Sequence, residues 1–310
     1  MSPMSEERVL APAKINLTLE VLGKRTDGYH DLASIMVAVD LADEITLTGA
    51  DKVTLDCDVP GLSGPDNLAY LAAERLRRET GTSAGVHITL KKNIPEAAGL
   101  GGGSSDAAAV LIGLNRLWKL GMSAEELTPI AAELGSDVPF FLYGGTAMVQ
   151  GRGEIVRPLP AADIKHALVV SPDIHVDAKT ATLFGLLGHG VPTRGALTRK
   201  LEARIRGGGD VPPQFLYNRF DDVADQAYPA LAEYRQALAA MGATEIHLCG
   251  AGPSMFTLVE RREVGTTLEL LLKHRYGWRS HLVSPTAPVQ WPSGAQWPAS
   301  ENADTGSSHE

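Results

Sequence analysis

Alternating apolar and polar residues predict a strand close to the amino terminus. The apolar set is Ile15, Leu17, Leu19 and Val21, and the polar set is Lys14, Asn16, Thr18 and Glu20. Because successive side chains of a strand point to opposite faces, the pattern predicts one buried face and places Lys14 beside Asn16 on the other. The periodicity leaves open whether Lys14 is a solvated strand lysine or a functional group.

Shorter apolar patterns predict the other elements. We expect strands over residues 34–39, 44–48, 53–57, 86–90, 167–171, 245–248 and 254–259. We expect helices over residues 66–79, 107–120, 194–206 and 223–241. In the first of these helices one face carries Leu68, Leu71, Ala72 and Leu76. Ser123 and Glu126 form a capping box, which predicts a further helix that ends near Leu134.

Changes in composition divide the chain. Residues 151–160 are rich in Gly, Pro and charge, which is typical of a linker. We therefore predict one domain over residues 1–160 and a second over residues 161–282. Residues 283–310 contain no Lys or Arg and are rich in Pro, Ser, Ala and Gly, so we expect a disordered tail.

Composition and charge narrow the class of protein. Of the 310 residues 44% are hydrophobic, which supports a packed core, and the net charge of −9 argues against nucleic-acid binding. Two isolated cysteines predict reduced thiols, and nine scattered histidines make a structural zinc site an unfavoured reading. The polar amino-terminal residues and the lack of a long apolar run predict a cytoplasmic protein without membrane contact.

A glycine-rich segment carries the most specific chemistry. Four glycines within residues 99–103 precede Ser104, Ser105 and a helix. Glycine lets backbone N–H groups approach an anion, and a helix N-terminus adds unpaired donors, so the segment predicts phosphate binding. A Walker A loop needs a lysine that is missing after Gly103, and Ser104 replaces the third glycine of a dinucleotide fingerprint. A flexible linker is disfavoured because an alanine-rich helix follows directly.

The sequence around Asp137 supports two hypotheses about its role. Either Ser136 or Asp137 could cap the short helix that Pro139 opens, and spacing alone favours such a cap over a catalytic base. Phosphoryl transfer to an alcohol requires a group that accepts the hydroxyl proton, and a carboxylate beside a lysine suits that task. For Tyr29 and Phe184, too, the alternative hypothesis is a structural role as aromatic residues of the core.

Three stretches together resemble the GHMP kinase superfamily and, within it, the 4-diphosphocytidyl-2-C-methyl-D-erythritol kinase family. They are residues 12–17 (PAKINL), 27–30 (DGYH) and 99–108 (GLGGGSSDAA). The resemblance extends from about residue 8 to residue 283. It implies an α+β, two-domain GHMP kinase fold, with an N-terminal ribosomal-S5-like α/β domain and a C-terminal ferredoxin-like α+β domain.

The resemblance also implies an activity and a set of site residues. The enzyme would use ATP to phosphorylate the 2-hydroxyl of 4-diphosphocytidyl-2-C-methyl-D-erythritol in non-mevalonate isoprenoid synthesis, with Asp137 as base and Lys14 as its charged neighbour. The residues implied to bind ATP are Asn67, Leu68, Lys92, Pro95, Glu96, Ala97, Ala98, Gly99, Leu100, Gly101, Gly102, Gly103, Ser104 and Ser105. Those implied to bind the cytidyl substrate are Asn16, Tyr29, His30, Thr180, Phe184, Gly250 and Gly252.

Two competing functions and a set of binding partners also follow from the sequence. A GHMP kinase for another small alcohol, and a nucleotide-binding module without turnover, are the competing functions. We expect a small-molecule partner, a cytidine diphosphate sugar-alcohol, and neither nucleic acid nor membrane; the oligomeric state is open. Mg²⁺ is expected to neutralise the ATP phosphates. Its protein ligands are not determined by the sequence, although Ser105 and Glu133 are conceivable.

Overall fold

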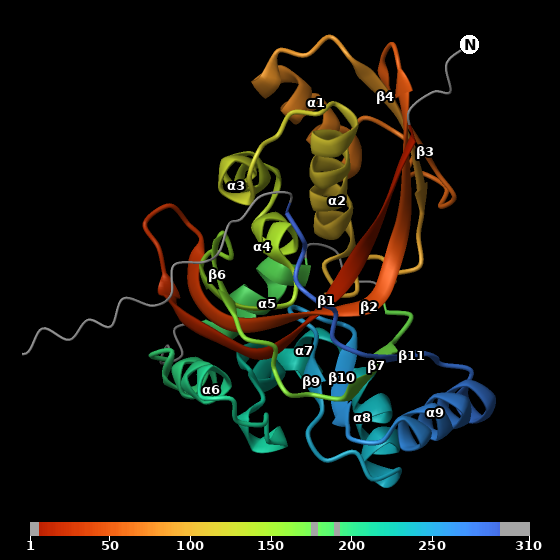
Figure 1. Ribbon diagram of the computed structural model, residues 1–310. Helices are drawn as coiled ribbons and strands as arrows, with labels where there is room; N and C mark the ends of the chain where they lie inside the picture. Colours follow the sequence, from red (N-terminus) through yellow and green to blue (C-terminus); the bar gives the residue numbers. More distant parts are fainter. Residues whose placement is uncertain (1–5, 175–178, 189–192, 292–310) are drawn as a thin grey trace, which may run out of the picture.

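Two β-sheets with helices on their outer faces form the molecule (Figure 1). The computed structural model describes residues 6–174, 179–188 and 193–291. The strands are β1 Glu6–Lys24, β2 His30–Ala50, β3 Val53–Cys57, β4 Gly85–Lys91, β5 Thr146–Gly151, β6 Ile155–Leu159, β7 His166–Ser171, β8 Tyr217–Asn218, β9 His247–Leu248, β10 Met255–Val259 and β11 Arg279–Val283. The helices are α1 Leu68–Thr80, α2 Gly102–Leu117, α3 Ala124–Leu134, α4 Val138–Tyr143, α5 Lys179–Leu187, α6 Ala196–Arg206, α7 Ala224–Ala227, α8 Leu231–Ala240 and α9 Arg262–Leu271.

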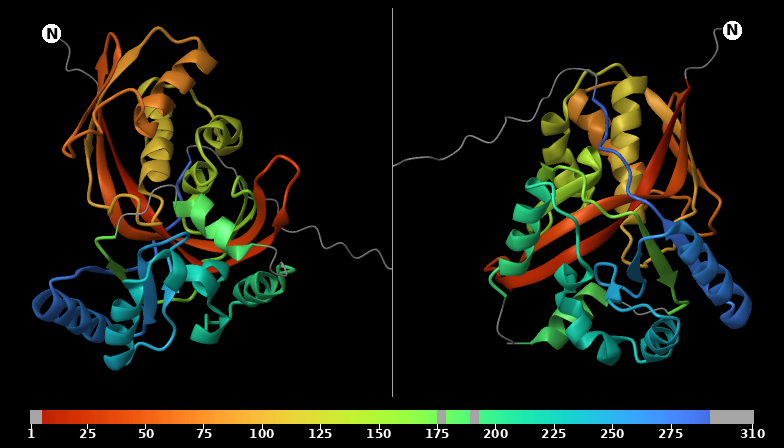
Figure 2. Two further views of the ribbon diagram at one scale, coloured as in Figure 1. Left: turned by 180° about the vertical axis from the view of Figure 1, so that it is seen from behind. Right: turned by 60° about the horizontal axis from the view of Figure 1, so that its bottom comes forward.

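The larger sheet has seven strands and is built on the antiparallel pair β1–β2. Its main order is β3-β4-β2-β1-β8, and β5 also pairs with β2 and carries β6 at its other edge. Helices α1–α4 cover one face of this sheet, and the smaller sheet, of order β11-β7-β10-β9, lies against the other (Figures 1 and 2). The two strands predicted over residues 34–39 and 44–48 are one continuous strand, β2.

Strand β1 is buried on both faces, so the prediction of one buried face was wrong. Ile15 and Leu17 pack toward the smaller sheet, while Lys14, Asn16 and Glu20 on the other face are also almost inaccessible. The alternation identified the strand correctly, but it could not show what covers the polar face. Buried polar groups need partners, and the partners of Lys14 and Asn16 lie in the cleft described below.

The apolar core runs through the proposed domain boundary. One cluster joins Ile35 and Val37 of the larger sheet to Val169 and Phe256 of the smaller sheet. Strand β8, which follows residue 160, pairs in parallel with β1 and so completes the larger sheet. The division into residues 1–160 and 161–282 therefore stays a prediction.

Several helix predictions are confirmed, with shifted ends. The capping box of Ser123 and Glu126 is present at the start of α3. Helix α2 begins at Gly102, inside the glycine-rich segment, rather than at residue 107. Leu71, predicted to face the core, is 40% exposed, because small alanines of α1 occupy the packed face instead. The helix predicted over 223–241 is interrupted between α7 and α8, where Pro229 has no N–H to donate.

Part of the predicted tail is ordered on the larger sheet, contrary to expectation. The backbone N–H groups of Thr286 and Val289 donate to the carbonyls of Ala38 and Tyr143 at 2.9 and 2.8 Å. The indole of Trp291 donates to the carbonyl of Leu142 at 3.1 Å and packs against the core under α1–α4. Composition could not reveal this docking edge, which is supplied by residues more than a hundred positions earlier. Residues 292–310 lie outside the described part of the chain.

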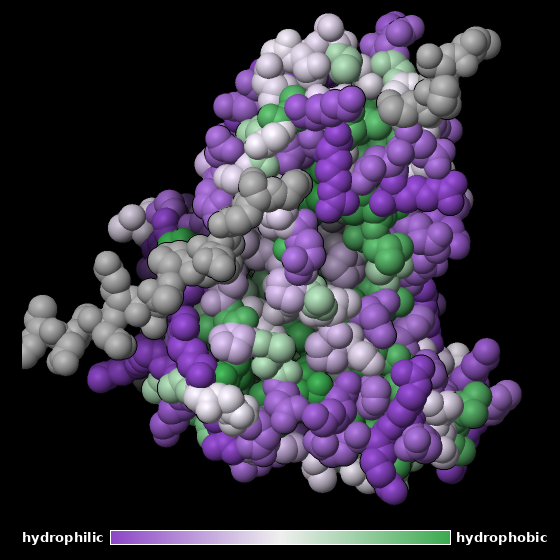
Figure 3. Space-filling model, viewed as in Figure 1, coloured by the Kyte–Doolittle hydropathy of each residue, from purple (hydrophilic) through white to green (hydrophobic). Residues whose placement is uncertain are grey.

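The surface carries mixed polar and apolar residues. In the view of Figure 3 hydrophilic residues cover most of the face, with hydrophobic residues interspersed between them. Within the described residues no helix is long and apolar enough to cross a membrane.

Docking of residues 285–291 predicts a stability difference between two truncated chains. A chain that ends at Ser284 should unfold at a lower urea concentration than a chain that ends at Trp291. The lost burial of Val289 and Trp291 and the lost hydrogen bonds together predict a deficit of about 2–3 kcal/mol. Equal unfolding midpoints, measured by circular dichroism, would contradict this assignment.

Candidate active site

The glycine-rich segment wraps the N-terminus of α2 and leaves its backbone donors free. Gly101 is the N-cap residue at φ +77°, and no side chain caps the helix. The first N–H groups of any helix lack intrahelical partners and carry partial positive charge. Without a capping side chain, the N–H groups of Gly102, Gly103 and Ser104 are available to an anionic ligand. This geometry favours phosphate binding.

The segment is held in place by a glycine-containing turn over residues 249–254 (CGAGPS), which we call the third glycine motif. Gly99 adopts φ +85°, and a Cβ at this position would overlap the carbonyl oxygen of Cys249. The N–H of Ser254 donates to the carbonyl of Ala98 at 3.1 Å. A side chain at position 99 would therefore push the two segments apart.

Lys14 and Asp137 meet beside this segment, although they come from opposite ends of the first half of the chain. Lys14 Nζ lies 3.9 Å from Asp137 Oδ2 and donates to Asn16 Oδ1 at 2.8 Å. The Asn16 amide in turn donates to Ser34 Oγ at 2.8 Å, which fixes its orientation. Asp137 occupies the N-cap position of α4, yet its side chain makes no capping hydrogen bond. The carboxylate is thus 32% exposed and free to accept a proton.

A cleft of about 670 Å³ connects these groups and is lined by most of the predicted site residues. From the predicted set it is lined by Lys14, Tyr29, His30, Asn67, Leu68, Lys92, the segment 95–104, Asp137, Thr180, Phe184 and Gly250. Three predicted residues, Asn16, Ser105 and Gly252, are not part of this lining. Two cationic residues that the sequence did not single out, Arg152 and Lys179, also line it.

The three predicted aromatic residues Tyr29, His30 and Phe184 lie together in one part of the cleft. Phe184 stacks on His30, with ring centroids 4.0 Å apart and planes 3° from parallel, and not on Tyr29. Tyr29 is 51% exposed, and the guanidinium of Arg152 lies over its ring at 5.2 Å. Burial, with a smaller effect of Lys24, lowers the pKa of His30, which favours the neutral ring at neutral pH. None of the three rings is a fully buried core aromatic.

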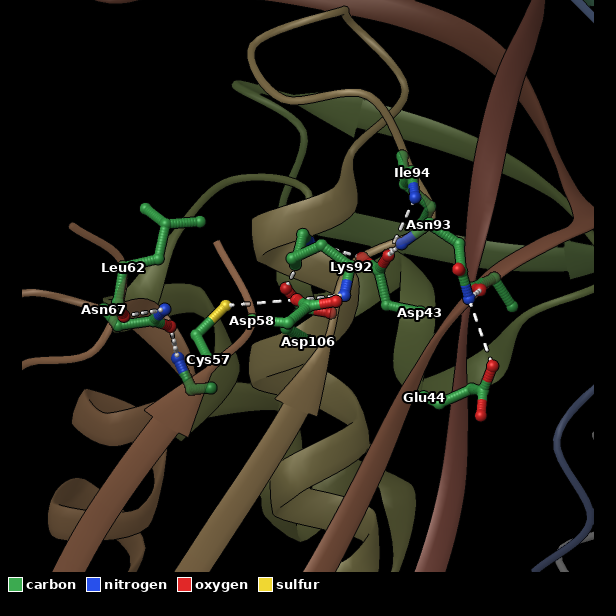
Figure 4. Close-up of polar contacts among 12 residues, drawn as sticks. Asp43, Glu44, Cys57, Asp58, Leu62, Asn67, Lys92, Asn93, Ile94 and Asp106 are labelled. Carbon is green, nitrogen blue, oxygen red and sulfur yellow. Dashed lines mark hydrogen bonds and ion pairs between the residues drawn. The ribbon is translucent and has the colours of Figure 1, made fainter. Parts of the chain in front are cut away.

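A buried ion cluster includes Lys92 and Asp106 of the cleft lining (Figure 4). Lys92 Nζ lies between the carboxylates of Asp43 and Asp106, with Asp106 Oδ2 at 2.7 Å. Asp43 Oδ1 also accepts the backbone N–H groups of Asn93 and Ile94 at 2.5 and 2.8 Å. Burial raises the pKa of Asp106 to about 7, even though Lys92 favours its charged form. The Lys92 ammonium is thus engaged by carboxylates, which leaves its backbone and alkyl chain for contact with a nucleotide.

The two conceivable metal ligands have different surroundings. Ser105 Oγ is buried at the first turn of α2, directly after the lining residue Ser104, and has no hydrogen-bond partner among the described residues. Glu133 instead pairs with Arg75 at 2.6 Å on the surface and does not line the cleft. The described residues contain no group of three or more His, Cys, Asp or Glu that could hold a metal ion.

Comparisons with known proteins agree with the geometry. The profile of the GHMP kinases N terminal domain matches residues 67–145. The chain is 40% identical to the 4-diphosphocytidyl-2-C-methyl-D-erythritol kinase of Dehalococcoides mccartyi, over 91% of this chain and 99% of that protein. It is 43% identical to the same kinase of Symbiobacterium thermophilum, over 83% and 92% of the two chains.

The chain belongs to the 4-diphosphocytidyl-2-C-methyl-D-erythritol kinase family. A crystal structure of 4-(cytidine 5'-diphospho)-2C-methyl-D-erythritol kinase superposes with a TM-score of 0.76 at 32% identity, and covers 90% of this chain and 100% of its own. Homoserine kinase from Cytophaga hutchinsonii superposes with a TM-score of 0.74 at 21% identity, over 94% and 98% of the two chains, which shows the shared fold. The predicted fold class and family are confirmed.

Asp43, Arg152 and Lys179 are residues of the site region that sequence reasoning missed. Asp43 falls at the middle of strand β2 with no local motif, and its role depends on the pairing of β2 with β4. Arg152 lies in the segment that was interpreted as a linker. Each of these three residues is identified as part of the site region only by its contacts with residues that are distant in sequence.

A substitution in the ion cluster should alter the KM for ATP and leave kcat nearly unchanged. Asp43→Asn removes one charge of the cluster and weakens the support for the backbone that leads into residues 95–104. We expect the KM for ATP to rise about tenfold, which corresponds to about 1.4 kcal/mol, while kcat changes little. Steady-state kinetics with each substrate varied in turn will measure this split.

The neighbouring strand position offers a matched control. Glu44 pairs with Lys91 at 2.8 Å across the same two strands, but both side chains are exposed. Exposed pairs contribute little, so Glu44→Gln should leave the KM for ATP unchanged. A similar effect of both variants would show that the buried position has no special role.

Proposed function

We propose that this protein transfers the γ-phosphoryl group of ATP to the 2-hydroxyl of 4-diphosphocytidyl-2-C-methyl-D-erythritol, giving the 2-phosphate and ADP, in the non-mevalonate route to isoprenoid precursors. The observation that carries the proposal is the placement of Lys14 and Asp137 beside the free N-terminus of α2 in one cleft. Relatives that match nearly the whole chain bear the name of this kinase.

The reaction follows from three groups of residues. The backbone N–H groups of Gly102 and Gly103, at the start of α2, bind phosphate oxygens. The Asp137 carboxylate accepts the proton of the substrate hydroxyl while that oxygen bonds to the γ-phosphorus and the bond to ADP breaks. Lys14, 3.9 Å from Asp137, stabilises negative charge on the oxygen, and Asn16 holds the lysine in place.

Divalent metal chemistry is compatible with these residues. Mg²⁺, when bound with ATP, would neutralise phosphate charge. Ser105 Oγ is one described side-chain atom that would suit such a ligand, because it is buried without a partner, and Asp106 Oδ1 is another. Mg²⁺ commonly uses few protein ligands together with phosphates and water, which is consistent with the lack of an acidic cage among the described residues.

The cytidyl end of the substrate would occupy the aromatic part of the cleft. Tyr29, His30 and Phe184 line it together, and a flat base is well held by aromatic faces and edge hydrogen bonds. A GHMP kinase for another small alcohol would have no use for these rings. They therefore favour the cytidyl substrate over mevalonate, homoserine or galactose.

Loss of the base should stop turnover and spare nucleotide binding. Asp137→Asn keeps the shape of the side chain but cannot accept the hydroxyl proton, so we expect kcat to fall about 10²–10⁴-fold. The affinity for ADP, measured by calorimetry, should stay within about twofold. The exposed loop variant Asp51→Asn serves as the control for loss of a carboxylate. Full activity of Asp137→Asn would exclude this residue as the base.

The choice of substrate is tested at Tyr29. In a coupled assay of ADP release, the wild-type protein should turn over 4-diphosphocytidyl-2-C-methyl-D-erythritol and not mevalonate, homoserine or galactose. Tyr29→Ala should raise the KM for the cytidyl substrate about tenfold, because base stacking on an aromatic ring contributes about 1–3 kcal/mol. The KM for ATP should not change. An unaltered KM for the cytidyl substrate would favour a different alcohol.

A further inference from the structure

Lys179 connects three segments of the cleft through one ammonium group. It is the first residue of α5, the helix that also carries Thr180 and Phe184. Its Nζ donates to the carbonyl of Ala97, in the glycine-rich segment, and to the carbonyl of Gly252, in the third glycine motif, at 2.5 Å. The side chain is partly buried and lines the cleft.

The charge of Lys179 has no counter-ion within the described part of the chain. Its hydrogen-bond partners are neutral carbonyls, and it forms no ion pair with a described Asp or Glu. Burial and then the ammonium of Lys14 lower the pKa of Lys179 to about 8. Cys249 also faces it, but burial raises the pKa of that thiol to about 12, so the thiol is neutral near pH 8. Among the described residues, the charged group that acts on Lys179 is therefore another cation, Lys14.

An uncompensated cation in a partly buried site is costly unless a ligand supplies the opposite charge. Two other cations of the cleft region have such partners: Lys14 has Asp137, and Lys92 has Asp43 and Asp106, whereas the guanidinium of Arg152 donates to the carbonyl of Ala132 and lies over the Tyr29 ring. A lysine ammonium has three donors, and the two carbonyls leave one for a ligand. The cleft is open to that ligand, because Lys179 forms part of its lining.

We propose that Lys179 binds a phosphate group of a ligand in the cleft and so holds the glycine-rich segment, the third glycine motif and α5 around that phosphate. The inference rests on the proposed function only in the choice of ligands, since ATP and a cytidyl diphosphate both carry phosphates. Lys179 is in this view a phosphate-binding residue of its own, in addition to the backbone donors of α2.

The experiment measures binding of ADP and of CDP separately, by calorimetry, between pH 7.5 and pH 9.5. Both nucleotides keep their phosphate charge over this range, and turnover is not required. The variants are Lys179→Met, which removes charge and donors, Lys179→Gln, which keeps a neutral donor, and Lys179→Arg, which keeps the charge. Lys165→Met is the control, because Lys165 is an exposed lysine paired with Asp163. Thermal unfolding checks that each variant is folded.

The expected result is charge-dependent binding of at least one nucleotide. Lys179→Met and Lys179→Gln should weaken it at least tenfold at pH 7.5, while Lys179→Arg retains most of the affinity. Because a bound phosphate favours the ammonium form, wild-type affinity should fall as the pH rises through about 8. The Met variant should lack this pH dependence. The nucleotide that responds, ADP or CDP, identifies which ligand provides the phosphate.

Two results would overturn the inference. If Lys179→Met binds both nucleotides as tightly as the wild-type protein does, no phosphate contacts the ammonium. If Lys179→Gln binds as tightly as the wild-type protein while Lys179→Met binds weakly, residue 179 acts only as a neutral hydrogen-bond donor to the two carbonyls. Failure of the proposed function is a separate result, since it would appear as absent turnover of the cytidyl substrate by the wild-type protein.

Discussion

The close approach of two backbone segments at Gly99 is the constraint on which the site depends. The carbonyl of Cys249 fills the space where a side chain at position 99 would begin, so only glycine allows the contact. The contact joins the smaller sheet to the segment that precedes α2, and the N–H of Lys14 ties the same segment to β1 through the carbonyl of Leu100 at 2.9 Å. Without it, the N-terminus of α2 and the pair of Lys14 and Asp137 would have no fixed relation.

Electrostatics in the cleft is local and differs from the charge of the whole chain. The net charge is −9, yet the cleft places backbone donors and a few cations where phosphates are expected. Each cation has a different environment. Lys14 lies near one carboxylate and Lys92 is held by two, whereas the described partners of Lys179 are neutral carbonyls. An acidic surface and a phosphate-binding site are therefore compatible, because the interactions that matter act over a few ångströms in a partly water-excluded space.

Local sequence signals predicted most of the helices and strands, but they predicted less well which residues are buried and what those residues contact. The capping box before α3, strand β3 and the strand-turn-strand around Gly250 could be found because each depends on residues close in sequence. The reading of Asp137 as a helix cap was right about its position and wrong about its hydrogen bonding, since the carboxylate faces Lys14. The tail was misjudged for the opposite reason: its composition is typical of disorder, but a complementary edge elsewhere in the chain orders residues as far as Trp291.

By itself, the sequence determined the alternation of β1, the glycine-rich entry into α2 and, through three motifs taken together, the family. These properties are set by neighbouring residues or by short patterns. Only the tertiary structure decided that the polar face of β1 is buried, that Phe184 lies on His30, and that Lys179 has no counter-ion among the described residues. The reason is physical: burial and charge compensation depend on which distant segments pack together, and that information is spread over the whole chain.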